Sequence, residues 1–204
     1  VLQIDIDEEE IGRNYDNTEG ILGDAKKSLN SLLEALKARM EAKESRVEEL
    51  SKIKEERFNP ATVIEPQNSY VNAIRRAVPD DGILISGMTQ IGYYSRNKYE
   101  VYEPRTYLTS SYYGNLGFAY PTALGAKVAR PDKPVIAVSG DGGFMFNVQE
   151  LSTAVHHNIN AIVVVFNDNA FGNVMRDQVN MFDGREYGAI VHNPDFMKIG
   201  RAHV

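Results

Sequence analysis

The sequence predicts an α/β fold, in which a parallel sheet is covered by helices on both faces and preceded by an N-terminal helical segment. Two observations favour this class. Residues 134–139 and 160–166 are short, strongly apolar runs with the length of buried strands, and a segment of helical periodicity separates them. Glycine and acidic residues follow directly after both runs. Strands that alternate with helices form parallel sheets, and such sheets bind ligands at the carboxyl ends of their strands.

The first 57 residues are highly charged, with 15 acidic and 10 basic side chains. Leu2, Ile4 and Ile6 alternate with polar residues and predict an opening strand. Asp24 is the expected N-cap of the helix that follows. The apolar face of this helix comprises Ala25, Leu29, Leu32, Leu33 and Leu36. Residues 39–57 also predict a helix, which has so few apolar side chains that we expect it to be solvated.

From residue 66 onward, expected strands and helices alternate. Pro66 suits the first turn of a helix over residues 66–78. Further helices are expected at residues 118–129 and 147–157. The expected strands cover residues 82–86, 105–109, 134–139 and 160–166.

The composition excludes several classes of protein. The chain has 204 residues, no cysteine and a formal net charge of -6. Without cysteine there is no disulfide framework, zinc–thiolate site or cysteine nucleophile, and a reducing, cytoplasmic location is expected. The negative charge argues against a nucleic-acid partner. No apolar run approaches the roughly 18 residues that a membrane span needs, so no membrane partner is expected.

Acidic side chains follow two strands that we expect to be neighbours in the sheet. Gly140-Asp141-Gly142-Gly143 ends one strand and enters a helix, and Asn167-Asp168-Asn169 ends the next. Two carboxylates at one sheet edge, beside glycines and free helix N–H groups, predict a magnesium ion that bridges the protein to a phosphate-bearing ligand. Either motif alone is ordinary turn chemistry. The two together, with 24 residues between Gly142 and Asn167, form a much rarer pattern.

The stretch GDGGFMFNVQELSTAVHHNINAIVVVFNDNAFG resembles the cofactor motif of thiamine-diphosphate-dependent enzymes. Residues 114–121 resemble the segment around the cofactor's pyrimidine ring in the acetolactate synthase branch, and residues 86–90 resemble a phosphate-side loop of that branch. The opening, IDIDEEEIGRNY through GDAKKSLNSLLEAL, is similar to the last strand and helix of the family's central domain. The resemblance thus covers nearly the whole chain and implies the thiamine-diphosphate-binding fold.

The resemblance also implies a division of the chain into domains. Residues 1–38 would be the end of the central domain, and residues 39–60 a charged helical linker. Residues 61–204 would be the domain that binds the diphosphate side of the cofactor, truncated at its C-terminus.

Individual residues acquire roles from the same resemblance. The side chains of Asp141 and Asp168 and the backbone carbonyl of Ala170 would bind magnesium. Asp168 stands where the family usually has asparagine, and its carboxylate still provides an oxygen ligand. Leu116 would wedge between the two rings of the cofactor while the Gly114 carbonyl holds its 4'-amino group, which makes these two the catalytic candidates. The other cofactor-binding candidates are Gln90, Asn115, Gly140, Gly142, Gly143, Phe171 and Gly172.

The implied function is decarboxylation or carboligation of a small-molecule 2-oxo acid by a homodimer or homotetramer. A glutamate on the pyrimidine domain of a second subunit would activate the cofactor, so the chain by itself is expected to be inactive. Acetolactate synthases usually carry a tryptophan shortly after the second motif, where this chain has Asp177. The particular 2-oxo acid therefore stays open, and so does the choice between a carboligase, a decarboxylase and an acyl-transferring relative. An alternative of another class also stays open, namely a non-catalytic module that binds a phosphorylated ligand or serves as an assembly surface.

Overall fold

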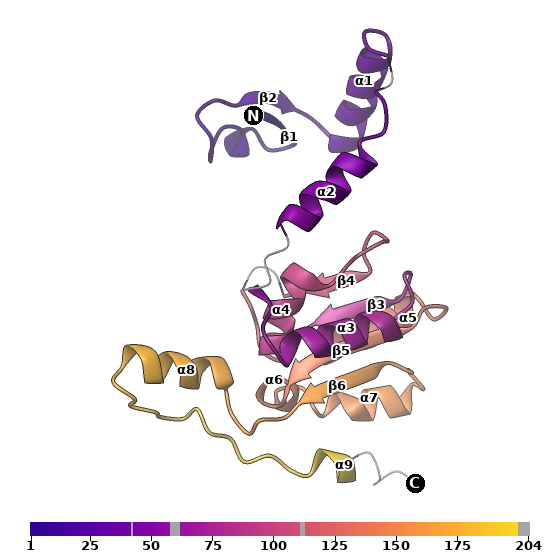
Figure 1. Cartoon of the computed structure of the whole chain (residues 1–204). Helices are drawn as coiled ribbons and strands as arrows, with labels where there is room; N and C mark the ends of the chain where they lie inside the picture. Colours follow the sequence, from indigo (N-terminus) through magenta and orange to yellow (C-terminus); the bar gives the residue numbers. More distant parts are fainter. Residues whose placement is uncertain (42, 58–61, 111–112, 200–204) are drawn as a thin grey trace. The chain divides into compact units, whose positions relative to one another are not determined.

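The computed structural model describes residues 1–41, 43–57, 62–110 and 113–199. The chain divides into two compact units, Val1–Asn59 and Pro60–Val204 (Figure 1). The predicted α/β class is confirmed, because a parallel sheet flanked by helices forms the second unit. No helix in the described ranges is long and apolar enough to cross a membrane.

The first unit combines two short parallel strands with two helices. Its elements are β1 (Leu2–Asp5), the 3-10 helix η1 (Glu8–Glu10), β2 (Glu19–Leu22), α1 (Ala25–Lys37) and α2 (Val47–Arg57). Strands β1 and β2 pair in parallel, with Leu2 opposite Glu19. The carboxylate of Asp24 caps α1 by accepting the backbone N–H of Lys27 at 2.9 Å. The expected opening strand and the expected N-cap are therefore both confirmed.

Helix α2 is shorter than the helix predicted over residues 39–57, because it begins only at Val47. Two contacts define its start. The Ser45 hydroxyl accepts the backbone N–H of Val47 at 3.4 Å, and the Arg46 carbonyl accepts the N–H of Leu50 at 2.9 Å. Residues 43–46 are all polar and offer no apolar side chain that could pack a further turn.

The second unit is a four-stranded sheet with the strand order β4-β3-β5-β6, and every neighbouring pair is parallel. Each strand expected after residue 66 is present. Three are one or two residues shorter than expected, whereas the strand expected at 134–139 keeps its length and lies one residue later. The elements are α3 (Gln67–Ala77), β3 (Ile83–Ser86), α4 (Gln90–Lys98), β4 (Tyr107–Thr109), α5 (Ala119–Ala129), β5 (Val135–Gly140), α6 (Asp141–Met145), α7 (Glu150–His156), β6 (Ile162–Phe166), α8 (Gly172–Met181) and α9 (Phe196–Ile199).

Helices bury both faces of this sheet, as the apolar strands predict. Alternate residues of a strand point to opposite faces. In β3, Leu84 packs with the side chains of α3 and α4, whereas Ile83 and Ile85 pack with those of α5 on the other face. Strand β5 repeats the pattern, because Val138 joins the first cluster and Ala137 the second.

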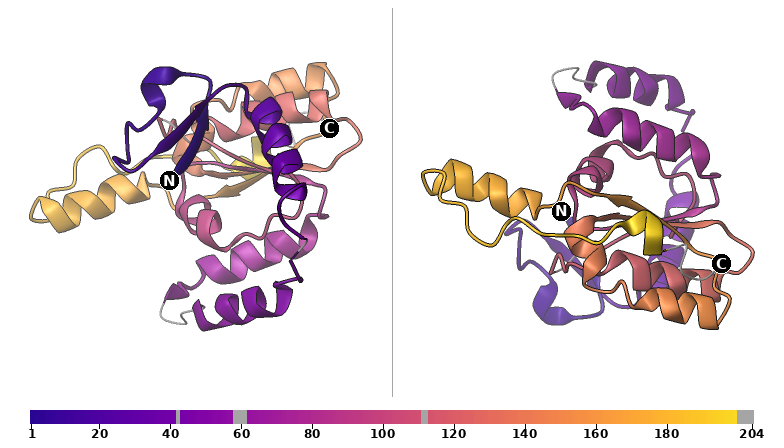
Figure 2. Two further views of the ribbon diagram at one scale, coloured as in Figure 1. Left: turned by 90° about the horizontal axis from the view of Figure 1, so that it is seen from above. Right: turned by 90° about the horizontal axis from the view of Figure 1, so that it is seen from below.

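Helices α4, α8 and α9 have no counterpart among the predicted elements. Helix α4 begins at the end of the segment 86–90, and α8 begins three residues after the Asn167-Asp168-Asn169 motif. Both helices mix polar with apolar residues, so no separate apolar run in the sequence indicates them. Helix α8 extends away from the sheet, and the segment that follows it returns toward the sheet edge (Figure 2). There the N–H of Phe171 donates to the Ala189 carbonyl at 2.7 Å, and the N–H of Val191 donates to the Asn169 carbonyl at 2.9 Å.

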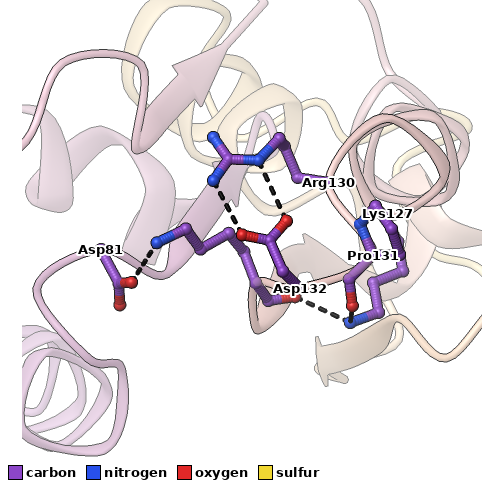
Figure 3. A network of polar contacts seen from close by, with 6 residues as sticks. Asp81, Lys127, Arg130, Pro131 and Asp132 are labelled. Carbon is purple, nitrogen blue, oxygen red and sulfur yellow. Dashed lines mark hydrogen bonds and ion pairs between the residues drawn. The ribbon is translucent and has the colours of Figure 1, made fainter.

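A polar network fixes the amino ends of the two central strands (Figure 3). The Lys133 ammonium group, just before β5, donates to the Asp81 carboxylate, just before β3. Lys127 donates to the carbonyl oxygens of Pro131 at 3.0 Å and Lys133 at 2.8 Å, which holds the turn between α5 and β5. The functional motifs lie at the opposite, carboxyl ends of the same strands.

Candidate functional site

A cavity of about 480 Å³ lies where β3, β5 and β6 end. This volume falls within the range of small-molecule sites. Eleven of the twelve predicted site residues line it: Gln90, Gly114, Leu116, Gly140, Asp141, Gly142, Gly143, Asp168, Ala170, Phe171 and Gly172. Asn115 lies outside this lining, and its backbone N–H donates to the Ser110 hydroxyl at 3.0 Å.

The parallel pairing of β5 with β6 brings the two acidic motifs to one edge. Gly140 stands opposite Phe166 in the register, so Asp141 and Asp168 follow directly on neighbouring strand ends. Asp141 begins α6 and is only 1% exposed. Among the residues that the structure describes, no lysine, arginine or histidine forms an ion pair with either carboxylate.

Asp168 lies at the mouth of the cavity. Although the residue is exposed, partial desolvation of its carboxyl group raises the pKa of Asp168, and the negative charge of the nearby Asp141 raises it further. One oxygen of Asp168 accepts the backbone N–H of Ala170 at 3.2 Å. Asn169 adopts a left-handed backbone with φ of 58°, which turns the chain sharply after β6. The two carboxylates therefore repel each other at the cavity.

The local geometry favours glycine at two positions. A Cβ atom at Gly142 would lie 2.5 Å from the ring of Phe171, so any larger residue would have to displace that ring. Gly114 has a φ of 64°, a conformation that residues with a Cβ rarely adopt. In both places the backbone itself borders the cavity.

Leu116 and Gln90 line other parts of the same cavity. Leu116 is 38% exposed although it is apolar, and its Cδ2 atom lies 3.7 Å from the position of a Cβ on Gly143. Gln90 begins α4 and donates its side-chain N–H to the side-chain oxygen of Asn173 on α8. Segments more than 80 residues apart in the sequence thus meet at the site.

Several lining residues have no signal in the sequence. They come from α3, α4, β6 and α8, and they include Gln67, Tyr70, Tyr93, Phe166, Asn173 and Val174. Asn193 was also not predicted, and its amide group contacts Asp141, Asn167 and Asn169. It lies in the irregular segment before α9, where the sequence has no motif that indicates a contact with the sheet edge.

The donor set fits a hard divalent cation. Magnesium binds oxygen ligands, typically one or two carboxylates together with phosphate oxygens and water. Across the described parts of the chain, no three or more His, Cys, Asp or Glu side chains gather as a metal site. Among the described residues, no ion pair neutralises the two carboxylates, so the oxygen-rich edge beside Ala170 is compatible with such a cation.

Comparison with known proteins agrees with this geometry. Residues 87–204 match the family described as thiamine pyrophosphate enzyme, C-terminal TPP binding domain. The match covers more than half of the chain, and the chain belongs to this family. Thiamine pyrophosphate is another name for thiamine diphosphate, so the predicted membership is confirmed.

Within this family the chain is acetolactate synthase-like. It is 32% identical over 213 residues to the acetolactate synthase large subunit of Haemophilus influenzae, of which it covers 37%. It is 30% identical to the acetolactate synthase isozyme 3 large subunit of Escherichia coli, again with 37% covered. A probable 2-ketoarginine decarboxylase of Pseudomonas aeruginosa is 29% identical, with 36% covered. Each alignment includes the whole of this chain, which spans about a third of the length of these relatives.

Proposed function

We propose that the chain is the diphosphate-binding part of a thiamine-diphosphate- and magnesium-dependent enzyme that decarboxylates or ligates 2-oxo acids. The observation that carries this proposal is the pair of carboxylates, Asp141 and Asp168, which border one cavity and repel each other. When bound, thiamine diphosphate supplies an electron sink for breaking or forming a bond at the carbonyl carbon.

The polar end of the cavity would hold the metal and the diphosphate. Asp141, Asp168 and the Ala170 carbonyl would supply three oxygens to magnesium. The first N–H groups of a helix have no acceptor within the helix. Those of Gly142 and Gly143, in the first turn of α6, would therefore donate to the diphosphate. Gln90 would lie beside it, while Gly140, Phe171 and Gly172 shape the wall.

The apolar end would hold the two rings of the cofactor. Leu116, the partly exposed leucine of the lining, would separate the rings and keep the cofactor bent. The backbone carbonyl of Gly114 would accept a hydrogen bond from the 4'-amino group and keep it near the reacting carbon. Both residues would act by holding reacting groups in place before any bond changes, which is a large source of rate enhancement.

The proposal includes a partner and a domain assignment. Residues 1–38 would end a preceding domain, residues 39–60 would be a linker, and residues 61–204 would bind the cofactor. The pyrimidine domain of a second subunit would complete the site in a homodimer or homotetramer. Exposed apolar side chains near the cavity support this, because Phe146 is 57% and Met145 37% exposed beside the α6 turn. The chain alone would then be inactive.

The substrate class rests on the relatives, whose names specify acetolactate synthesis and the decarboxylation of 2-ketoarginine. A sharp test titrates thiamine diphosphate into the protein by calorimetry, with and without Mg²⁺. Binding that requires the metal and disappears in Asp141→Ala supports the proposal. Binding that is indifferent to both would contradict it. The protein encoded by the complete gene is then assayed for carbon dioxide release from pyruvate and 2-ketoarginine.

A further inference from the structure

Asn193 makes an unusual set of contacts at the cavity edge. Its side-chain nitrogen, Nδ2, donates to the Oδ2 atom of Asp141 at 2.5 Å. The same nitrogen also lies 3.0 Å from the side-chain oxygen of Asn167 and 3.2 Å from that of Asn169. An amide nitrogen carries two hydrogens, so three acceptors converge on a group that can satisfy two of them fully.

The three acceptors belong to both halves of the proposed metal site. Asp141 follows β5, and Asn167 and Asn169 flank Asp168 after β6. Asn193 itself belongs to neither strand and arrives on the segment that returns from α8. Its amide group therefore joins the two strand ends from a third direction and fixes the rotation of the Asp141 carboxylate.

We infer that Asn193 is a positioning residue for magnesium binding, an inference that rests on the proposed function. Its hydrogen bond occupies one oxygen of Asp141 and presents the other to the metal. Ligating carboxylates are commonly oriented by such outer contacts, and loss of one typically costs about 10–100-fold in metal affinity. Asn193 also places the positive end of its amide dipole beside the negative Asp141 carboxylate, which lowers the repulsion between that carboxylate and Asp168.

A matched control separates this role from simple fastening of the segment. Gln178 on α8 holds the same returning segment, because its side chain donates to the Tyr187 carbonyl at 2.9 Å and accepts the Tyr187 N–H at 3.1 Å. Neither contact involves Asp141 or its neighbours. Gln178→Ala therefore loosens the segment and leaves the orienting bond in place.

The experiment measures Mn²⁺ binding to the protein by electron paramagnetic resonance, with saturating thiamine diphosphate. We expect Asn193→Ala and the similarly sized Asn193→Leu to weaken Mn²⁺ binding about 10–100-fold, and Gln178→Ala to leave it unchanged. Near-ultraviolet circular dichroism checks that each variant is folded. Unchanged binding in Asn193→Leu, or an equal loss in Gln178→Ala, would overturn the inference. Asp141→Ala serves as the separate test of the site itself, since wild-type Mn²⁺ binding in that variant would refute the proposed function rather than the role of Asn193.

Discussion

Asp141 and Asp168 lie at the ends of adjacent parallel strands, and the charge of the first raises the pKa of the second. No described ion pair involves either carboxylate. Their mutual repulsion therefore destabilises the folded protein when no cation is bound. In the proposed metal site, the same arrangement would attract a divalent cation. The predictions below treat these two consequences separately.

Removal of the buried carboxylate should abolish metal-dependent cofactor binding. In Asp141→Ala the diphosphate loses the cation that would neutralise it, so the affinity for thiamine diphosphate should no longer depend on Mg²⁺. Calorimetric titrations with and without Mg²⁺ measure this. Asp177→Ala is a suitable control, because Asp177 is an exposed aspartate whose described ion pair is with Arg176. An unchanged affinity in Asp141→Ala means that the metal site lies elsewhere.

The effect of replacing Asp168 on metal-dependent cofactor binding should depend on whether the new side chain keeps an oxygen ligand. Asparagine keeps an oxygen ligand, so Asp168→Asn should still bind thiamine diphosphate in the presence of Mg²⁺. Leucine keeps the size but offers no ligand, so Asp168→Leu should lose metal-dependent binding. The same calorimetric titration distinguishes them. If the leucine variant binds as well as the wild type, Asp168 is only a turn residue.

The metal-free protein should become more stable when the repulsion is removed. The pKa of Asp168 is raised in the folded chain above its ordinary value of 3.8, so at neutral pH its ionised form costs free energy of folding. Asp168→Asn removes this cost and should increase the free energy of unfolding at pH 7, by less than about 1 kcal/mol because the residue is solvent-exposed.

The gain in stability has a defined pH dependence. As the pH falls through the raised pKa toward 3.8, the wild-type carboxyl group becomes protonated and the difference between the two proteins should shrink. Urea unfolding in EDTA at several pH values measures it. A difference that grows as the pH falls would show that the sign of this coupling is wrong.

Truncation in the core between β3 and α5 should destabilise the second unit. Ile85 is fully buried and packs against the side chains of α5 and β5. Ile85→Ala should cost about 2–5 kcal/mol of unfolding free energy. Leu29→Ala is the control, because Leu29 is 53% exposed. Denaturant unfolding followed by circular dichroism compares the two, and equal effects would contradict the assigned core.

The chain alone should exchange the C2 proton of thiamine diphosphate slowly. The proposed partner domain supplies the proton-transfer group, and loss of such a group typically costs about 10²–10⁴-fold in rate. Exchange into deuterated water, followed by nuclear magnetic resonance, measures it. Fast exchange by the 204-residue chain would contradict the need for a second subunit.

Much of the fold could be predicted because its signals are local. Strands β3, β5 and β6 are short apolar runs, and the two acidic motifs follow β5 and β6 directly. Membership of the family therefore also followed from the motifs alone. The start of α2 was wrong by eight residues, because the charged segment before Val47 has helical propensity but no surface on which to pack.

The contacts that complete the site could not be predicted. Asn193 reaches Asp141 across 52 residues, and Gln90 reaches Asn173 across 83. Both contacts depend on where α8 leaves the sheet and where the chain returns, and neither is marked by a local pattern. The left-handed turn at Asn169 helps to set that path and suits asparagine, but asparagines in other conformations are common, so the residue alone does not predict it.

The adjacency of β5 and β6 has a consequence for how such a site can diversify. Both acidic groups belong to a single strand–helix–strand unit, whereas Gln90, Gly114 and Leu116 lie outside it, between β3 and α5. The segment from β5 to the end of β6 can be inherited as one block that keeps both carboxylates of the proposed cation site. The segments that border the rest of the cavity can then accumulate changes independently, so relatives that differ in substrate could share the proposed cation site.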